Sequence, residues 1–204
     1  CPSFLNWAVE YADDYIDIYS YHKYGEFSSM NQDRYDYWAD WADDVLAVIE
    51  STGKPYWNDE TNTYRPFVGL YESKQEPWHG TQVILSQIAL MNAGIERSLL
   101  WSLTDQKWPD RLLGSEVAAS WEDGIHRCGI LRDMKISATP YLGYYAYSMV
   151  GKYIKGLGSK VYQGIGGGGV YLTMVEMSDG NVTIIAVNMN GDSRAVNYEL
   201  GEAI

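Results

Sequence analysis

The sequence predicts an α/β fold, and three observations support this prediction. First, helix-like and short strand-like segments alternate along residues 1–155 in the order α-β-α-β-α-β-α, which is typical of parallel strands joined by crossover helices. Second, the strand-like segments are short and apolar, as buried parallel strands are. Third, residues 156–204 are rich in glycine and β-forming residues, so we expect a β-rich segment after the α/β part.

Four segments are expected to form helices, and in residues 2–15 and 36–51 the apolar residues recur at helical spacing. Gly53 and Gly94 closely follow two of them, and glycine commonly ends a helix. Pro2 and Pro77 stand at the start of two of them, where proline fits the first turn. The expected helices are residues 2–15, 36–51, 77–93 and 140–154.

Three segments between these helices are expected to form parallel strands. They are residues 16–21 (I-D-I-Y-S-Y), 54–60 (K-P-Y-W-N-D-E) and 98–103 (S-L-L-W-S-L). In the β-rich segment, residues 170–176 and 182–188 are expected to form a hairpin around S-D-G-N, with residues 195–200 as a third strand. About 50 residues are too few for an independent β-sandwich. This segment should therefore pack on the α/β part or join strands supplied from elsewhere.

Composition and charge narrow the classes of partner. The net charge of −12 disfavours nucleic acid and anionic membranes, because both attract clustered Lys and Arg. No apolar run reaches the length of about 18 residues that a membrane-spanning helix needs. The 18 Tyr and 8 Trp residues suit wet, stacked surfaces such as sugar sites, although most are expected to be packing residues. The chain begins without Met inside the first expected helix, so we expect the native start upstream and leave the cellular location open.

Polar and aromatic side chains gather where the three expected strands end. They are His22, Tyr24, Asn58, Glu60, Trp101 and Asp105. The carboxyl ends of parallel strands meet at one edge of a sheet, where α/β folds place their active sites. We therefore expect these six side chains to face a common cleft.

Glu60 is the most informative of the six, and four roles are open to it: salt-bridge partner, nucleophile, general base or metal ligand. An ion pair is the most common role for a single glutamate. The metal role has little support, because His22, Glu60 and Asp105 lack a short-range ligand motif. Cys1 and Cys128 form no CxxC motif, and the sequence has no GxGxxG after a strand, no P-loop and no GxSxG. We expect no metal and no cofactor.

Several of these segments resemble the clan A glycoside hydrolases, and most closely the family of β-xylosidases and α-L-iduronidases. P-Y-W-N-D-E-T-N-T-Y-R-P is similar to the seventh strand of that barrel, I-D-I-Y-S-Y-H-K-Y-G to the sixth and S-L-L-W-S-L-T-D to the eighth. D-G-I-H-R-C-G-I-L and T-P-Y-L-G-Y-Y-A-Y resemble its trailing loop and closing helix. Two positions depart from the family: Asp59 stands where Thr is common, and Thr61 where an aromatic residue is common.

The resemblance implies a fold and a division of the chain. Residues 1–155 would be the C-terminal part of a (β/α)8 TIM barrel, containing its sixth to eighth strands. Residues 156–204 would belong to an accessory β-sandwich of the kind that often follows this barrel. A complete barrel takes roughly 250 residues, so the resemblance also implies that other strands complete it. A companion polypeptide, self-association or a longer chain would supply them.

The resemblance also implies a retaining glycoside hydrolase acting on a carbohydrate substrate, with Glu60 as the nucleophile. His22, Tyr24 and Asn58 would donate hydrogen bonds to the glutamate or the sugar, and Trp101 would stack on the sugar. Asp105, Trp108 and His126 would contact the substrate. Strand alternation would turn Asp59 to the opposite side from Glu60.

The general acid of this clan ends the fourth strand, and no segment of this chain matches that strand. Glu10, on an expected helix, and Glu26, in a loop, do not fit the role. Two other hypotheses stay open. One is a non-catalytic carbohydrate-binding or interaction protein derived from the same fold. The other is an unrelated α/β protein whose strand-end polar groups are structural, which burial of Glu60 against Lys or Arg would favour.

Overall fold

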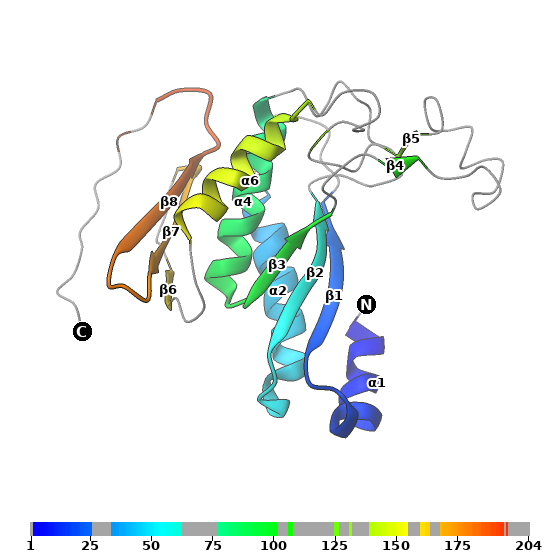
Figure 1. Ribbon diagram of the computed structural model, residues 1–204. Coiled ribbons are helices and arrows are strands. Elements are labelled where there is room, and N and C mark those ends of the chain that lie inside the picture. The colour runs from blue at the N-terminus through cyan, green and yellow to red at the C-terminus, as the bar shows by residue number, and fades with distance from the viewer. Residues whose placement is uncertain are drawn as a thin grey trace.

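The computed structural model of the protein describes residues 2–25, 34–62, 77–101, 106–107, 125–126, 131, 139–154, 160–163, 168–193 and 195. Its α/β part contains a three-stranded parallel sheet in the order β1-β2-β3. The strands are β1 (Tyr19–Tyr24), β2 (Tyr56–Asn62) and β3 (Arg97–Leu100). Figure 1 shows them side by side with helix α2 behind them, so one face of the sheet is covered by helix.

The helices confirm the expected alternation. They are α1 (Pro2–Ala12), α2 (Tyr35–Ile49), α4 (Pro77–Ala93) and α6 (Leu142–Tyr153), with short 3-10 helices at η1 (Asp13–Tyr15) and η2 (Glu50–Thr52). Gly53 ends η2 with a φ of 66°, a left-handed conformation that glycine adopts without strain. Two short strands that the sequence did not predict, β4 (Gln106–Lys107) and β5 (Ile125–His126), pair in antiparallel fashion between β3 and α6.

The first strand was placed wrongly from the sequence, because it begins at Tyr19 and not at residue 16. Residues 13–15 form η1, and Asp13 fixes this turn. Its carboxylate accepts a hydrogen bond from the Tyr19 hydroxyl at 2.8 Å and pairs with Lys54 Nζ at 2.7 Å. His22 and Tyr24 therefore lie inside β1 and not beyond its end. Likewise β2 continues past Glu60 to Asn62.

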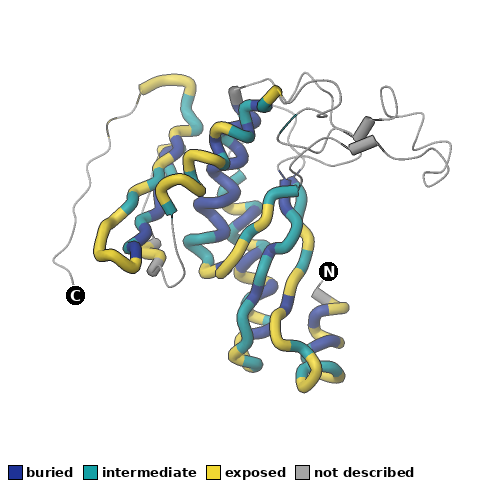
Figure 2. Tube along the Cα trace, in the orientation of Figure 1, coloured by how far each residue is buried: buried dark blue, intermediate teal, exposed yellow. Residues whose placement is uncertain are grey.

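The main core lies between the sheet and helix α2. Trp38, Ala42, Val45 and Ile49 of α2 are buried together with Tyr19 and Tyr56 of the strands. Helix α4 is buried almost all round, because α2, α6 and a second sheet surround it. Figure 2 shows this as dark blue along most of α4, whereas the strands of the sheet are dark blue only at intervals.

The second sheet is antiparallel in the order β6-β7-β8. Its strands are β6 (Lys160–Gln163), β7 (Val170–Glu176) and β8 (Val182–Asn188). The hairpin of β7 and β8 has the predicted bounds, whereas β6 lies in a segment expected to be turns. Of the expected third strand at 195–200, residue 195 is not in a strand and the rest lies outside the described residues.

The second sheet packs on α4 and shares a core with it. Val187 of β8 is buried with Val83, Leu85 and Ile88 of α4. Asn92 Nδ2 donates hydrogen bonds at 3.0 Å to the carbonyl oxygen of Leu172 and to the Tyr35 hydroxyl. The β-rich segment is therefore buttressed by the α/β part. A domain boundary near residue 155 stays a prediction.

Helices α4 and α6 touch closely at Gly143, and this contact gives a matched pair of predictions. A Cβ at Gly143 would lie 2.8 Å from Cε1 of His79, whereas a Cβ at Gly151 of the same helix would meet no atom within 4 Å. We expect Gly143→Ala to lower the free energy of unfolding by about 1–3 kcal/mol through overpacking. Gly151→Ala should raise it by about 0.5–1 kcal/mol, because alanine is the better helix former.

Urea denaturation followed by far-UV circular dichroism measures both changes. Equal effects of the two alanine substitutions would show that α4 and α6 do not meet at Gly143.

Candidate active site

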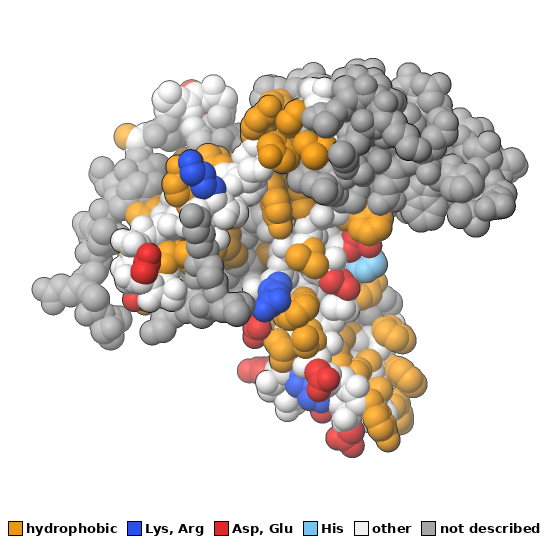
Figure 3. Space-filling view, in the orientation of Figure 1, with side chains coloured by type: hydrophobic (Ala, Val, Ile, Leu, Met, Phe, Trp, Pro, Cys, Tyr) orange, Lys and Arg blue, Asp and Glu red, His pale blue; other side chains and the backbone are white. Residues whose placement is uncertain are grey.

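The candidate site lies on the face of the parallel sheet that helix α2 does not cover. Along β1, Tyr21 packs against Trp41 with ring centroids 6.5 Å apart, and Lys23 Nζ lies 4.1 Å from the centre of the Tyr37 ring. Both side chains therefore face α2. Because successive side chains of a strand alternate, His22 and Tyr24 face the other way. Figure 3 shows histidine and acidic side chains adjoining one another on the face of the molecule turned to the viewer.

Strand β2 is irregular where its acidic residues lie. The two steps from Ser20 to His22 in β1 pair with three steps from Trp57 to Glu60 in β2. The pairing of β2 with β3 shifts in the same way between Asn58 and Thr61, so β2 carries the extra residue in both pairings. Such bulges re-aim side chains and are common beside active sites.

The irregularity brings both acidic residues of β2 to one histidine. His22 Nδ1 lies 3.3 Å from Glu60 Oε2, and His22 Nε2 lies 3.5 Å from Asp59 Oδ1. The expectation that Asp59 points away from Glu60 is therefore wrong. Regular alternation would separate the two carboxylates, but the bulged backbone allows both to reach the same imidazole.

Glu60 occupies a more protected position than its neighbours. Its side chain is 18% exposed, against 36% for Asp59 and 55% for His22. Burial raises the pKa of Glu60 above its ordinary value, and the charge of His22 partly opposes this rise. Among the described residues its ion-pair partner is a histidine and not Lys or Arg. Glu60 is thus not held in a simple structural salt bridge with Lys or Arg there.

Asn58 supports the backbone of the site from beneath. Its side chain is fully buried, and its amide nitrogen can donate to the carbonyl oxygens of Tyr21 and Glu60, each at 3.0 Å. These bonds tie β1 to β2 at the bulge. The structure therefore does not bring the Asn58 amide to the uncovered face, where a direct contact with substrate was expected.

Trp101 is fixed at the end of the sheet, immediately after β3. Its backbone nitrogen donates to the carbonyl oxygen of Thr61 at 2.8 Å, and its own carbonyl oxygen accepts a hydrogen bond from Asn62 Nδ2. Asn62 is almost fully buried. Asn62 has no role among the residues predicted from the sequence, although it stands two residues after Glu60. It fixes the Trp101 backbone beside the end of β2.

Of the remaining predicted residues, the structure describes Tyr24 and Glu10 in full. The backbone carbonyl of Tyr24 accepts a hydrogen bond from the Tyr37 hydroxyl at 2.6 Å. Its own hydroxyl is buried and has no hydrogen-bond partner among the described residues. Asp105, Trp108 and Glu26 lie outside the described residues, as does the side chain of His126. Glu10 lies exposed on α1, away from the sheet.

The raised pKa of Glu60 predicts how stability depends on pH. The folded state binds the Glu60 proton more tightly than the unfolded chain does, so the contribution of this group is most favourable at low pH. That contribution falls as pH rises through the folded-state pKa. We expect Glu60→Gln, which removes the ionisation, to raise Tm relative to the wild type by on the order of 1–3 °C at neutral pH, and by less near pH 4.

Differential scanning calorimetry across this pH range measures the difference. Glu50→Gln, at an exposed position, controls for the loss of one negative charge. A Tm difference for Glu60→Gln that shrinks as pH rises would contradict the assignment.

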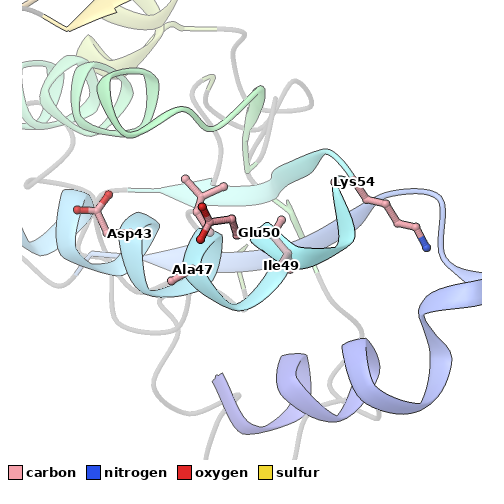
Figure 4. Close-up of a pocket in the computed structure, with 7 residues that line it drawn as sticks. Asp43, Ala47, Ile49, Glu50 and Lys54 are labelled. Atoms are coloured by element: carbon pink, nitrogen blue, oxygen red, sulfur yellow. The ribbon is translucent and has the colours of Figure 1, made fainter.

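A hollow lies away from these residues, at the other end of β2. It has a volume of about 350 Å³ and is lined by Asp43, Leu46, Ala47, Ile49, Glu50, Gly53 and Lys54. Figure 4 shows that these residues belong to the end of α2 and the turn that leads into β2. The amino-terminal end of a parallel sheet usually contributes to stability and not to catalysis, so this hollow is not the candidate site.

Neither a metal centre nor a membrane span is found in the described part of the chain. There, no group of three or more His, Cys, Asp or Glu side chains is arranged to hold a metal ion. Asp59 and Glu60 approach opposite nitrogens of His22 and so do not converge on one point. None of the described helices is long and apolar enough to cross a membrane.

Comparison with known proteins supports the fold. No family model matches the sequence, and no curated protein matches it. Solved structures do match. Among them are the GH51 arabinofuranosidase from Xanthomonas axonopodis pv. citri, with a TM-score of 0.59 and 12% identity over 94% of this chain, and the α-L-arabinofuranosidase from Thermotoga maritima, with a TM-score of 0.55 and 13% identity over 90%. The chain spans 42% and 36% of the length of these two proteins.

At such low identity the likeness shows the fold alone. Both proteins are arabinofuranosidases, and neither is a β-xylosidase or an α-L-iduronidase. The resemblance read from the sequence is therefore confirmed at the level of the fold and not at the level of the narrower family. The chain has a glycoside-hydrolase-like α/β fold.

Proposed function

We propose that this chain is the C-terminal part of a retaining glycoside hydrolase in which Glu60 is the nucleophile. The observation that carries the proposal is the position of Glu60. It lies toward the carboxyl end of a parallel strand, largely shielded from solvent and 3.3 Å from a histidine, in a chain whose structural neighbours are glycosidases. Active sites of α/β barrels lie at this end of the strands.

The proposed reaction is a double displacement. The Glu60 carboxylate attacks the anomeric carbon as the leaving oxygen departs, which forms a covalent glycosyl–enzyme ester. Water then attacks the same carbon, releases the sugar with its original configuration and frees the carboxylate. A second carboxyl group about 5 Å away must protonate the leaving oxygen and later deprotonate the water. We assign that group to a strand outside this chain.

The other residues of the uncovered face have supporting roles. His22 pairs with the nucleophile, and the partly exposed Trp101 indole is the surface on which the apolar face of a sugar stacks. Tyr24 is the last residue of β1 and pairs with Asn62, the last residue of β2. We assign the Tyr24 hydroxyl to the sugar or to Glu60. Asp105 follows Trp101 by four residues and keeps its predicted contact with substrate.

The surface next to β1 supports a barrel completed by other strands. In the described residues β1 pairs only with β2, so its other edge carries unpaired backbone groups, which readily accept another strand. Beside it, α1 and η1 expose an aromatic stripe formed by Phe4, Trp7 and Tyr11 of α1 and Tyr15 of η1, which are 53–90% exposed. Figure 3 shows hydrophobic side chains gathered in the region of α1. We assign this open edge and stripe to the rest of the barrel, from a companion polypeptide, another copy or a longer chain.

Dinitrophenyl glycosides test the nucleophile even where the general acid is absent. Dinitrophenolate is a good leaving group and needs no proton, so formation of the glycosyl–enzyme requires little more than Glu60 and a binding surface. The panel of substrates contains the α-L-arabinofuranoside, chosen from the structural neighbours. It also contains the β-D-xyloside and the α-L-iduronide, chosen from the sequence resemblance. Release of dinitrophenolate, with the first sugar product shown by proton NMR to retain its configuration, is the expected result.

Native mass spectrometry of the same preparation tests the completed barrel. A second polypeptide, a second copy or a longer chain bound to this one is the expected result. Sugar binding by a lone chain without release of dinitrophenolate would instead support the non-catalytic alternative. Inversion of configuration would exclude the nucleophilic role of Glu60.

A further inference from the structure

The two carboxylates around His22 set a condition on its proton. A neutral imidazole carries one N–H and one lone pair, and an ionised carboxylate can only accept hydrogen bonds. Asp59 Oδ1 lies beside Nε2 and Glu60 Oε2 beside Nδ1. With a neutral ring and two ionised carboxylates, one lone pair would always face another acceptor. One additional proton, on the ring or on a carboxyl group, resolves this conflict.

The two carboxylates do not have equal surroundings, and this decides their roles. Asp59 is the more exposed, and its second oxygen, Oδ2, accepts a hydrogen bond from Ser20 Oγ at 3.0 Å. Glu60 is more buried and faces Nδ1. Asp59 is therefore held by Ser20 with its Oδ1 beside Nε2 of the ring, and this oxygen is buried without a hydrogen-bond partner among the described residues. Glu60 lies beside Nδ1, where attack on a sugar is proposed.

Other charged groups near β1 are directed elsewhere. Lys23, next in sequence to His22, points to the α2 side of the sheet and lies against the rings of Tyr37 and Trp41. Arg97 of β3 stacks on Trp57 at a distance of 4.4 Å, toward the start of β2. Among the described residues of the three strands, Asp59 and Glu60 are the charged groups within 4 Å of His22.

We propose that Asp59 is a positioning residue. It anchors the Nε2 side of His22, so that Nδ1 holds a proton against Glu60 and the nucleophile is presented to the sugar as an ion-paired carboxylate. The role of Glu60 as nucleophile rests on the proposed function. The contacts of His22 with Asp59 and Glu60 do not depend on catalysis. The bulge in β2 is the structural cause, because a regular strand would not bring both carboxylates to one ring.

His22 Nδ1 and Glu60 Oε2 lie 3.3 Å apart and would share this proton. The negative charge of Asp59 increases the affinity of the pair for this proton. Asp59→Asn should therefore make the pair lose its proton at a pH that is lower by about one unit. This is the smaller end of the range for a nearby charge, because Asp59 is partly exposed. Ser20→Ala, which frees the anchor, should shift it in the same direction by less.

The titration is followed by NMR, through the ring signals of His22 and the side-chain carboxyl carbon of Glu60, assigned with His22→Gln and Glu60→Gln. Asp59→Glu keeps the charge and should restore most of the wild-type titration. Asp43→Asn removes the same charge at the remote hollow and should leave it unchanged. The inference is overturned if Asp59→Asn shifts the titration no more than Asp43→Asn does.

Kinetics then separate this inference from the proposed function. If the protein hydrolyses the dinitrophenyl glycosides, the alkaline limb of the pH profile of kcat/KM should move to lower pH in Asp59→Asn, and Asp59→Glu should reverse this. A shifted NMR titration without any hydrolysis would support the role of Asp59 and count against the glycosidase. Hydrolysis with an unshifted titration and an unshifted pH profile would support the glycosidase and refute the role of Asp59.

Discussion

Replacing Glu60 by Gln is expected to lower kcat/KM on dinitrophenyl glycosides by about 10⁴–10⁶-fold, the size of loss seen when a catalytic nucleophile is removed. The amide keeps the shape of the side chain but cannot form the covalent ester. The folded structure should survive, because the Glu60 carboxylate has no Lys or Arg partner among the described residues. Steady-state kinetics and circular dichroism on the same samples measure both properties.

Two further variants sharpen this prediction. In Glu60→Ala, added azide should restore release of dinitrophenolate, because azide fits the space of the lost carboxylate and attacks from the same side. The product should be a glycosyl azide of inverted configuration. Glu50→Gln, far from the site, should retain activity within about 2-fold. Loss of less than about 10-fold in Glu60→Gln would show that Glu60 is not the nucleophile.

Truncating Trp38 to Ala is expected to have the largest effect on stability, a loss of about 3–5 kcal/mol in the free energy of unfolding. Trp38 is fully buried in the core between α2 and the sheet, and alanine would leave a cavity there. In a chain of this size the loss corresponds to a fall in Tm of roughly 6–20 °C. Differential scanning calorimetry and urea denaturation measure it.

Trp7 of the aromatic stripe provides the matched control. It is 53% exposed on α1, so Trp7→Ala should change the unfolding free energy of the isolated chain by about 0.5 kcal/mol or less. The same variant should weaken any assembly that covers the stripe. Equal destabilisation by the two alanine variants would contradict the packing of α2 against the sheet.

The order of elements was predictable because each has a strong local signal. Pro77 and Gly94, which flank the apolar segment 77–93, marked both ends of α4. The alternating residues on either side of S-D-G-N gave both strands of the hairpin. Strand β6 was missed because glycine-rich stretches flank it, and its pairing with β7 is a tertiary contact that no local signal records.

The details of the site were less predictable, because they depend on contacts between strands. That Glu60 and His22 would lie together followed from the ends of parallel strands meeting at one edge. The contact of Asp59 with the same histidine did not, because it requires a bulge that alternation along a single strand cannot show. Alternation along a single strand also placed Asn58 on the same side as Glu60, facing the substrate. In the structure, the Asn58 amide can instead donate to the backbone carbonyl oxygens of Tyr21 in β1 and Glu60 in β2.

The most direct test of the central claim is to trap the glycosyl–enzyme. The protein, in whatever assembly it purifies, is incubated with dinitrophenyl 2-deoxy-2-fluoro glycosides, whose fluorine slows the release of the covalent intermediate more than its formation if the mechanism is retaining. We predict that mass spectrometry of the intact chain shows the addition of one sugar, and that peptide mapping places it on Glu60. A sugar attached to another residue, or hydrolysis of the unsubstituted glycosides without any trapped adduct, would contradict the assignment of Glu60 as the nucleophile.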